Sequence, residues 1–127
     1  LMESDLFEAL WACTEGCLDE VAVRWSSKAS CCVVAAAQQY PSASSKGEPI
    51  EVQALPENTF LYHAGTKVRE DGRVVTDGGR VLAVTAVAPD MEAAQKLAYN
   101  AIEAVKFKDI AYRTDIARRA LKPCVSS

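Results

Sequence analysis

Hydrophobic residues form two long runs in this chain, and both runs predict strands. The first covers residues 29–37 and consists of small apolar side chains apart from Ser30. The second runs from Val81 to Val87 and reads VLAVTAV, without polar alternation. Runs of this length with branched residues are typical of strands covered on both faces. We therefore expect the first strand near the centre of a sheet and the second covered on both faces.

A β-hairpin is predicted between the two runs. Phe60-Leu61-Tyr62 suits a strand because bulky side chains pack well on a pleated surface. Asp71-Gly72 lies between Val68 and Val74-Val75, and such a pair between apolar residues indicates a hairpin turn with positive φ angles. A tight glycine turn, formed around residues 76–80, is then expected to lead into the second apolar run.

Apolar residues at helical spacing predict two helices. The first should begin at Ser4 as N-cap and extend for about four turns to Gly16. The second should follow the N-cap Asp90 and continue to about residue 105, where its alanine-rich stripe packs on the sheet. A further helical turn or two is expected through Leu121.

The polar segment 38–56 contains Pro41, Pro49, Pro56 and Gly47, so it should be mainly loop, with 50–52 as a short strand. This segment is the best candidate for a mobile part of the chain. Trp25 is expected to be a core or interface anchor.

The composition is that of an ordinary globular protein. Of 127 residues, 50% are hydrophobic and 24% are charged, which predicts one domain with its own core. The formal net charge of −3 argues against a nucleic-acid partner held by bulk electrostatics. No apolar run is long enough to span a bilayer, and residues 1–5 lack the basic start of a secretory signal. The leading Leu1 indicates a processed chain or a fragment.

Five cysteines are present, namely Cys13, Cys17, Cys31, Cys32 and Cys124. Neighbouring residues of a strand point to opposite faces, so Cys31 and Cys32 are poor disulfide partners. A metal site would need more ligands than one histidine supplies. Buried, reduced thiols are therefore expected.

The chemistry-bearing residues are cations and glycines rather than a complete catalytic set. The single histidine, His63, lacks a recognisable nucleophile partner, and no phosphate loop is present. Cations and glycine backbones bind anions and orient substrates, so the residues favour a binding or accessory domain. Arg80 follows Gly78-Gly79 at the start of a strand, where a bidentate grip on carboxylate or phosphate is favoured. The alternative is that these glycines only form the turn and Arg80 is solvated.

Three segments of the chain, in this order, resemble one family. They are Tyr62-His63-Ala64-Gly65-Thr66, the stretch 76–85 with its Gly-Gly-Arg-Val-Leu core, and Ile110-Ala111-Tyr112-Arg113-Thr114-Asp115-Ile116 followed by Arg119-Ala120. The series resembles the C-terminal domain of phosphoribosylamine–glycine ligase, the glycinamide ribonucleotide synthetase of purine biosynthesis. The resemblance covers the chain to Leu121, and the first helix resembles the tail of a preceding ATP-grasp domain.

The resemblance implies a function for a longer protein. Such enzymes join glycine to phosphoribosylamine through a glycyl phosphate, with ATP and Mg²⁺ bound by upstream ATP-grasp domains that have no match here. The C-terminal domain closes over the catalytic centre and helps hold the sugar phosphate, so the 127 residues alone should be inactive.

The expected residues bind substrate and none is catalytic. The guanidinium groups orient the phosphoribosyl group, while the histidine and threonine line the cleft because the amine needs positioning more than deprotonation. The expected set is Arg80, Gly79, Gly78, His63, Gly65, Thr66, Arg113, Arg119 and Lys46.

Two departures from the family pattern are visible. The family loop Gly-Tyr-Pro-Gly reads Gln39-Tyr40-Pro41-Ser42 here, so a close backbone approach at this loop is in doubt. In the last motif, a usual glycine is Ala117. These changes indicate a divergent member or a loop that no longer closes tightly.

The sequence thus predicts an α+β fold, a small, mainly antiparallel sheet with two packed helices that resembles the C-terminal rudiment hybrid motif of ATP-grasp ligases. Residues 1–20 would be the ATP-grasp tail, 21–122 the substrate-binding domain and 123–127 a frayed tail. A cytoplasmic location or an organelle stroma after processing is expected, with no nucleic-acid or membrane partner. The alternatives are a non-catalytic interaction module and the equivalent domain of another ATP-grasp enzyme, such as a biotin carboxylase.

Overall fold

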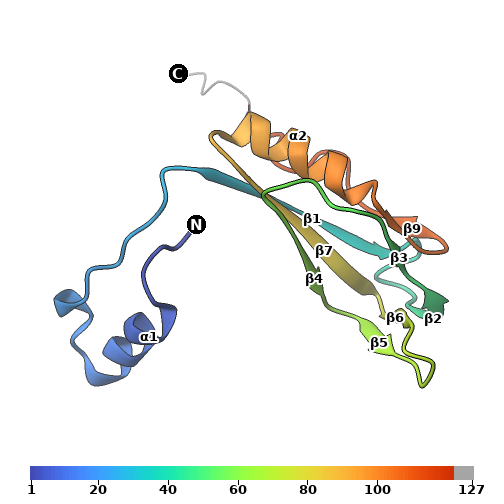
Figure 1. The fold of residues 1–127 in the computed structure, drawn as a ribbon, viewed down its shortest axis with the longest axis horizontal. Coiled ribbons are helices and arrows are strands. Elements are labelled where there is room, and N and C mark those ends of the chain that lie inside the picture. The colour runs from blue at the N-terminus through green and yellow to red at the C-terminus, as the bar shows by residue number, and fades with distance from the viewer. Residues whose placement is uncertain (122–127) are drawn as a thin grey trace.

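Strand β1 (Ala29–Ala37) lies inside the largest sheet, in agreement with the sequence-based expectation. The computed structural model describes residues 1–121. In it, β1 pairs with β7 (Arg80–Ala88) on one side and β9 (Ile110–Ala111) on the other, and β4 (Thr59–His63) pairs with the free edge of β7. All of these pairs are antiparallel, and the strand order is β4-β7-β1-β9 (Figure 1).

Helix α2 (Met91–Ile102) covers one face of this sheet and packs on β1 and β7 (Figure 1). The Asp90 carboxylate caps the helix by accepting a hydrogen bond from the Ala93 amide at 2.8 Å. Small side chains let the helix backbone approach the strands closely, as their packing with no exposed surface indicates. The fully buried helix residues are Ala94, Ala98, Ala101 and Ile102.

The other face of the sheet is open. Alternate residues of β1, β7 and β4 point to it, and Val34, Phe60 and Tyr62 are exposed there at 40%, 49% and 56%. The prediction that the second apolar run is covered on both faces is wrong for this face, because Ala83 and Thr85 are only half-buried. The helix covers one side, and no element of the described chain covers the other.

A second sheet contains the predicted hairpin. Strand β6 (Val74–Gly78) pairs with β5 (Thr66–Val68) through a turn in which Gly72 has φ 81°. Its other edge pairs with β2 (Ser45–Pro49). A small third sheet joins β3 (Glu51–Val52) to β8 (Val105–Lys106).

Segment 38–56 is mainly turn and loop, with the short strand β3 close to where it is expected, but strand β2 within it is not predicted. Thr76, with 1% of its surface exposed, is bonded to the Ser45 hydroxyl at 2.9 Å and accepts from the Glu48 amide at 3.1 Å. These bonds come from a residue far along the chain. A polar, proline-rich segment therefore becomes a strand through its long-range partner.

The N-terminal residues form a separate lobe (Figure 1). Helix α1 (Leu6–Glu15) makes its main contacts with the single turn η1 (Leu18–Glu20). Its N-cap is Asp5, and Ser4, the expected cap, instead accepts a hydrogen bond from the Arg24 amide at 3.0 Å. The helix ends at Gly16 with φ 74°, as the sequence predicts.

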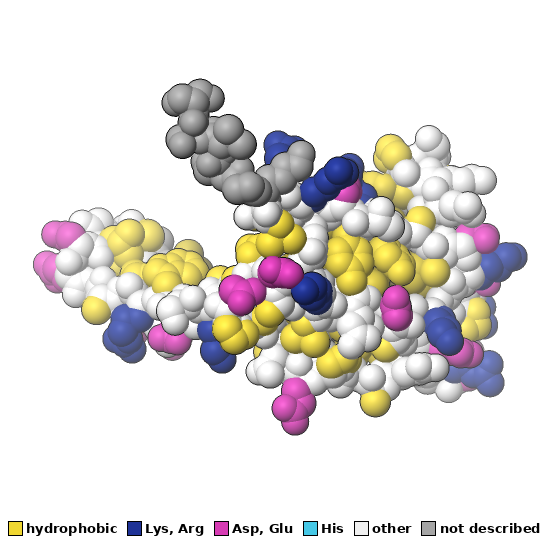
Figure 2. All heavy atoms as spheres, turned by 90° about the horizontal axis from the view of Figure 1, so that it is seen from above, with side chains coloured by type: hydrophobic (Ala, Val, Ile, Leu, Met, Phe, Trp, Pro, Cys, Tyr) yellow, Lys and Arg dark blue, Asp and Glu magenta, His cyan; other side chains and the backbone are white. Residues whose placement is uncertain are grey.

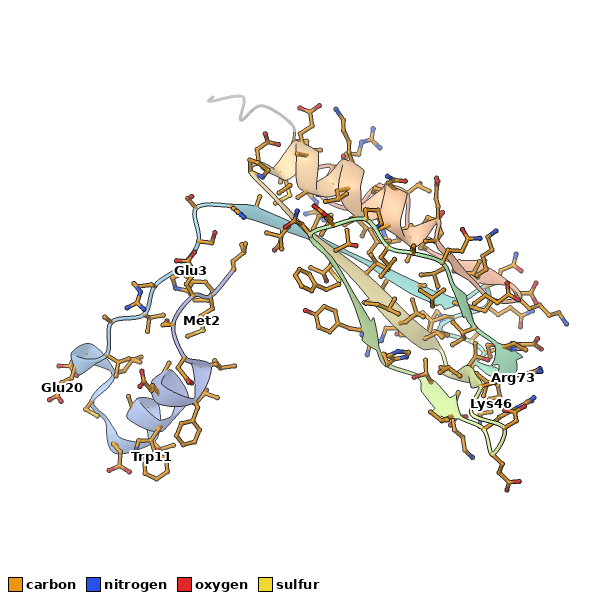
Figure 3. All side chains as sticks on the ribbon, in the orientation of Figure 1. Met2, Glu3, Trp11, Glu20, Lys46 and Arg73 are labelled. Atoms are coloured by element: carbon orange, nitrogen blue, oxygen red, sulfur yellow. The ribbon has the colours of Figure 1, made fainter. Side chains whose placement is uncertain are left out.

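The apolar stripe of α1 faces outward rather than into a core. Phe7 and Trp11 are exposed at 70% and 58% and stack on each other. Figure 2 shows hydrophobic side chains on the surface of this lobe, and Figure 3 shows Trp11 on its outer side. Trp25 is 65% exposed and forms an isolated β-bridge with Met2, so it is not a core anchor, and its role as an interface anchor stays a prediction. The expected division at residue 20 remains a prediction.

Two further expectations need correction. The segment after β9 forms turns rather than a helix, with Ala117 at φ 62°. Of the described cysteines, all free, only Cys31 is buried, which raises the pKa of its thiol, whereas Cys13 and Cys32 are exposed. Cys124 and the expected tail at residues 123–127 lie outside the described residues.

Across residues 1–121, none of the helices is both long enough and apolar enough to cross a bilayer.

The close contact of α2 with the sheet gives a first testable expectation. Ala98 has no exposed surface, so Ala98→Leu forces a larger side chain into a filled space and should lower the free energy of unfolding by about 1–3 kcal/mol. Urea unfolding followed by circular dichroism measures this loss. Lys96→Ala on the exposed side of the same helix should stay within about 0.5 kcal/mol of the parent. Equal losses in the two variants would contradict the packing.

Candidate functional site

Arg80 begins β7 at the junction of the two larger sheets. Its carbonyl accepts a hydrogen bond from the Gly65 amide at 2.9 Å, and the Val81 carbonyl accepts one from Ala64 at 3.0 Å. On the other side, the carbonyl of Gly79 accepts a hydrogen bond from the Ala37 amide at 2.8 Å. The backbone of Arg80 is therefore held by two neighbouring chain segments, while its side chain remains exposed.

The glycines around Arg80 are needed for close approach of backbones. A Cβ atom on Gly65 would lie 2.7 Å from the Arg80 carbonyl oxygen and 2.8 Å from the Gly78 Cα atom. Gly78 and Gly79 have no left-handed φ angle. The expected tight turn is also absent, because Gly79 alone links β6 to β7, which do not pair. Substrate contacts by Gly65, Gly78 and Gly79 remain predictions.

Two hollows flank the Arg80 side chain on the open face of the sheet. One, of about 370 Å³, is shared with Arg113 and Tyr112, and the other, of about 590 Å³, is shared with Gly65 and Gly79. The two hollows have three lining residues in common, namely Val34, Tyr40 and Arg80. Arg80 thus borders one hollow together with Tyr112 and Arg113, and another together with Gly65 and Gly79.

Arg113 reaches this site with its guanidinium group already paired. It donates to the Asp115 carboxylate at 2.8 and 2.6 Å. These bonds lower the pKa of Asp115 and raise the pKa of Arg113. The Tyr99 hydroxyl of α2 donates to the Arg113 carbonyl at 2.6 Å and accepts from the Ile116 amide at 3.0 Å, so the segment is fixed to the helix.

The structure separates other predicted site residues from Arg80. His63 Nδ1 and Thr66 Oγ1 lie 3.1 Å apart and bond to each other, and neither residue lines the two hollows. Lys46 borders a different hollow, of about 280 Å³, with Lys108 and Glu48, and Figure 3 shows it at the end of the molecule far from the N-terminal lobe.

Arg119 also lies outside the Arg80 hollows. It borders another hollow, of about 510 Å³, with Arg113 and Asp115. Arg113 thus lines one hollow with Arg80 and another with Arg119, so the predicted cations are spread over several surfaces.

Two aromatic residues of the site are missing from the predicted binding residues. Tyr40 and Tyr112 both line the smaller hollow beside Arg80. Tyr40 lies in the polar segment that the sequence pattern assigns to loop. The sequence feature that could have indicated it as a site residue is its Tyr-Pro pair. Tyr112 directly precedes the predicted Arg113.

Chemically, the site can bind and orient an anion. An exposed guanidinium group on a fixed backbone offers paired N–H donors to a carboxylate or phosphate. Within residues 1–121, no group of three or more His, Cys, Asp and Glu side chains could hold a metal ion. The fold and site together define an α+β domain with an exposed arginine that is suited to bind an anion.

Comparison with known proteins identifies the family. The family model described as phosphoribosylglycinamide synthetase, C domain, matches residues 30–119, and the chain belongs to this family. It is 48% identical over 124 residues to a bifunctional purine biosynthetic protein of Schizosaccharomyces pombe, covering 97% of this chain and 16% of that protein. It is 40% identical over 119 residues to the phosphoribosylamine–glycine ligase of Caldanaerobacter subterraneus, covering 92% of this chain and 28% of that protein.

A solved structure supports the same fold. The phosphoribosylamine–glycine ligase of Thermotoga maritima superposes with a TM-score of 0.57 at 40% identity, covering 66% of this chain and 20% of that chain. The expected α+β class with mainly antiparallel sheets is confirmed, and the resemblance to the C-terminal region of the ligase is confirmed as well. The chain spans less than a third of the length of each of these relatives.

The backbone contact between Gly65 and Arg80 can be tested by adding one methyl group. Gly65→Ala places a Cβ atom 2.7 Å from the Arg80 carbonyl oxygen, so the two segments must separate, and the free energy of unfolding should fall by about 1–3 kcal/mol. Thermal and urea unfolding measure the loss.

A glycine with free space around it provides the control. A Cβ atom on Gly72 would have no neighbour within 4 Å, and the residue has φ 81°, an angle that asparagine tolerates. Gly72→Asn should therefore change the free energy of unfolding by less than about 1 kcal/mol. A neutral Gly65→Ala would show that the segments do not meet as closely as described.

Proposed function

We propose that this chain is the substrate-orienting C-terminal domain of a phosphoribosylamine–glycine ligase. The observation that carries the proposal is the exposed side chain of Arg80, on a backbone held from both sides and bordered by two hollows, in a member of this family. The relatives' name states that their reaction joins phosphoribosylamine to glycine. The phosphate of phosphoribosylamine is the anion that suits the guanidinium group.

In this proposal, Arg80 binds the phosphoribosyl group and orients the amine. Arg113 is the second cation within the same hollow, but its charge is shared with Asp115. Arg80 therefore provides the stronger attraction for an added anion. Positioning suits this reaction, because an amine that is held close to an activated carboxyl group needs little further help to react.

ATP and Mg²⁺ belong to other parts of the longer protein in this proposal. Residues 1–121 contain no cluster of three or more His, Cys, Asp and Glu side chains suited to hold a metal ion. The role proposed for them is orientation and closure rather than phosphate activation. ATP would activate the glycine carboxylate in those other parts, and the residues of this chain would hold the sugar phosphate beside it.

The role of Arg80 is tested in the full-length enzyme by steady-state kinetics. Arg80→Ala removes charged hydrogen bonds to the substrate, which are worth about 1.5–3 kcal/mol, so kcat/KM for phosphoribosylamine should fall by roughly 10–100-fold. The KM values for ATP and glycine should change little. Unchanged KM and turnover for phosphoribosylamine would refute the assignment.

Arg73→Ala is the matched control for this experiment. Arg73 lies in the β5–β6 hairpin, is 73% exposed and contacts only Asp71, at 3.7 Å, among the described ion pairs. The same loss of one positive charge at this position should leave kcat/KM within about twofold of the parent, since long-range effects of exposed charges are screened by salt.

The 127 residues by themselves should hydrolyse no ATP. The purified chain, mixed with ATP, Mg²⁺, glycine and phosphoribosylamine, is expected to release no ADP above the rate of a blank. The full-length enzyme is the positive control. Glycine-dependent ADP release by the pure chain would show that activation of the carboxylate takes place within these residues.

A further inference from the structure

Tyr40 lies beside Arg80 and is in contact with the residue that precedes it. A Cβ atom on Gly79 would lie 2.5 Å from Cδ2 and 3.0 Å from Cε2 of the Tyr40 ring. One edge of the ring therefore occupies the space where any other residue would carry a side chain. The ring can take this position only because residue 79 is glycine.

The backbone ties the same three segments together. The Ala37 amide donates to the Gly79 carbonyl at 2.8 Å, and the Tyr40 amide donates to the Ala37 carbonyl at 2.9 Å. Ala37 is the last residue of β1, so Tyr40 follows that strand in a turn that returns it to Gly79. The ring is thus placed by a short, hydrogen-bonded connection rather than by a long free loop.

Tyr40 is also a wall of both hollows that flank Arg80. A side chain that borders both sides of the guanidinium site limits where a ligand can lie against it. Tyr40 is 46% exposed, so part of its surface remains available to a ligand. Its hydroxyl group has no hydrogen-bond partner among the described side-chain contacts, so the ring itself makes the contacts that place it.

We infer that Tyr40 is a positioning residue for the Arg80 site, and that its ring, seated on Gly79, sets how the sugar phosphate lies against the guanidinium group. This inference rests on the proposed function. The aromatic ring carries the role, and the hydroxyl group does not. Loss of the ring leaves Arg80 in place but opens the wall between the two hollows, so the substrate binds in a less productive position.

The test is a set of kinetic variants of the full-length ligase. Tyr40→Ala should lower kcat/KM for phosphoribosylamine by about tenfold, mainly through kcat, because a misplaced substrate loses much of the benefit of orientation. The KM values for ATP and glycine and the melting temperature should stay near those of the parent. Tyr40→Phe keeps the ring and should remain within about twofold of the parent.

Gly79→Ala supplies a second, independent approach. Its methyl group displaces the ring, so it should reproduce the fall in kcat/KM of Tyr40→Ala. In the double variant the ring is already absent, so Gly79→Ala should add no further decrease. If the two substitutions each lower kcat/KM and their effects multiply in the double variant, the inference is contradicted. Substitutions that remove one shared contact should not have additive effects on the free energy. If Gly79→Ala does not fold, the Tyr40→Ala and Tyr40→Phe pair still decides.

Tyr62→Ala is the matched control. Tyr62 is a tyrosine on the open face of the same sheet, is 56% exposed and lines neither hollow. It should leave kcat/KM for phosphoribosylamine unchanged. If Arg80→Ala lowers kcat/KM for phosphoribosylamine but Tyr40→Ala does not, the inference about Tyr40 is wrong and the proposed function stands. If Arg80→Ala has no effect, the proposed function fails, and the inference fails with it.

Discussion

The backbone hydrogen bond between Gly65 and Arg80 joins the two larger sheets at a place where a side chain on residue 65 would not fit. Here the chain from β4 to β5 crosses the chain from β6 to β7, with the Gly65 amide 2.9 Å from the Arg80 carbonyl oxygen. A Cβ atom on either Gly65 or Gly78 would lie 3.0 Å or less from the opposite backbone. The two larger sheets can meet at this junction because both residues are glycine.

The same junction explains how a small domain can offer a fixed anion-binding group. A guanidinium group on a long side chain loses less freedom on binding when its backbone is already held in place. Arg80 receives this support from Gly65 on one side and from Ala37, through Gly79, on the other. The glycines thus contribute through the placement of Arg80, whether or not they also contact a ligand.

Much of the fold could be predicted from the sequence because local patterns determine it. The apolar run at residues 29–37, the Asp71-Gly72 turn and the cap at Asp90 each specify their element without distant partners, and the structure has β1, the β5–β6 hairpin and α2 at these places. Strand β2 could not be predicted, because Ser45 and its neighbours depend on bonds with Thr76 in a distant segment.

The site could be predicted only in part for the same reason. The Gly-Gly-Arg pattern indicates Arg80, but residue types alone cannot separate His63, which bonds to Thr66, from the residues that border Arg80. The place of the Tyr40 ring against Gly79 depends on the turn that follows β1. The outward-facing stripe of α1 shows a similar limit, since helical spacing predicts an apolar face but not what covers it.

The most direct measurement is a crystal structure of the full-length protein with a phosphoribosyl compound bound. We expect the Arg80 guanidinium group to donate hydrogen bonds of about 2.7–2.9 Å to the phosphate oxygens of the ligand. We also expect the Gly65 and Ala37 hydrogen bonds around Arg80 to be present in that structure. A phosphate group that is bound elsewhere, with Arg80 facing solvent, would contradict the role of this arginine as the anion-binding residue of the domain.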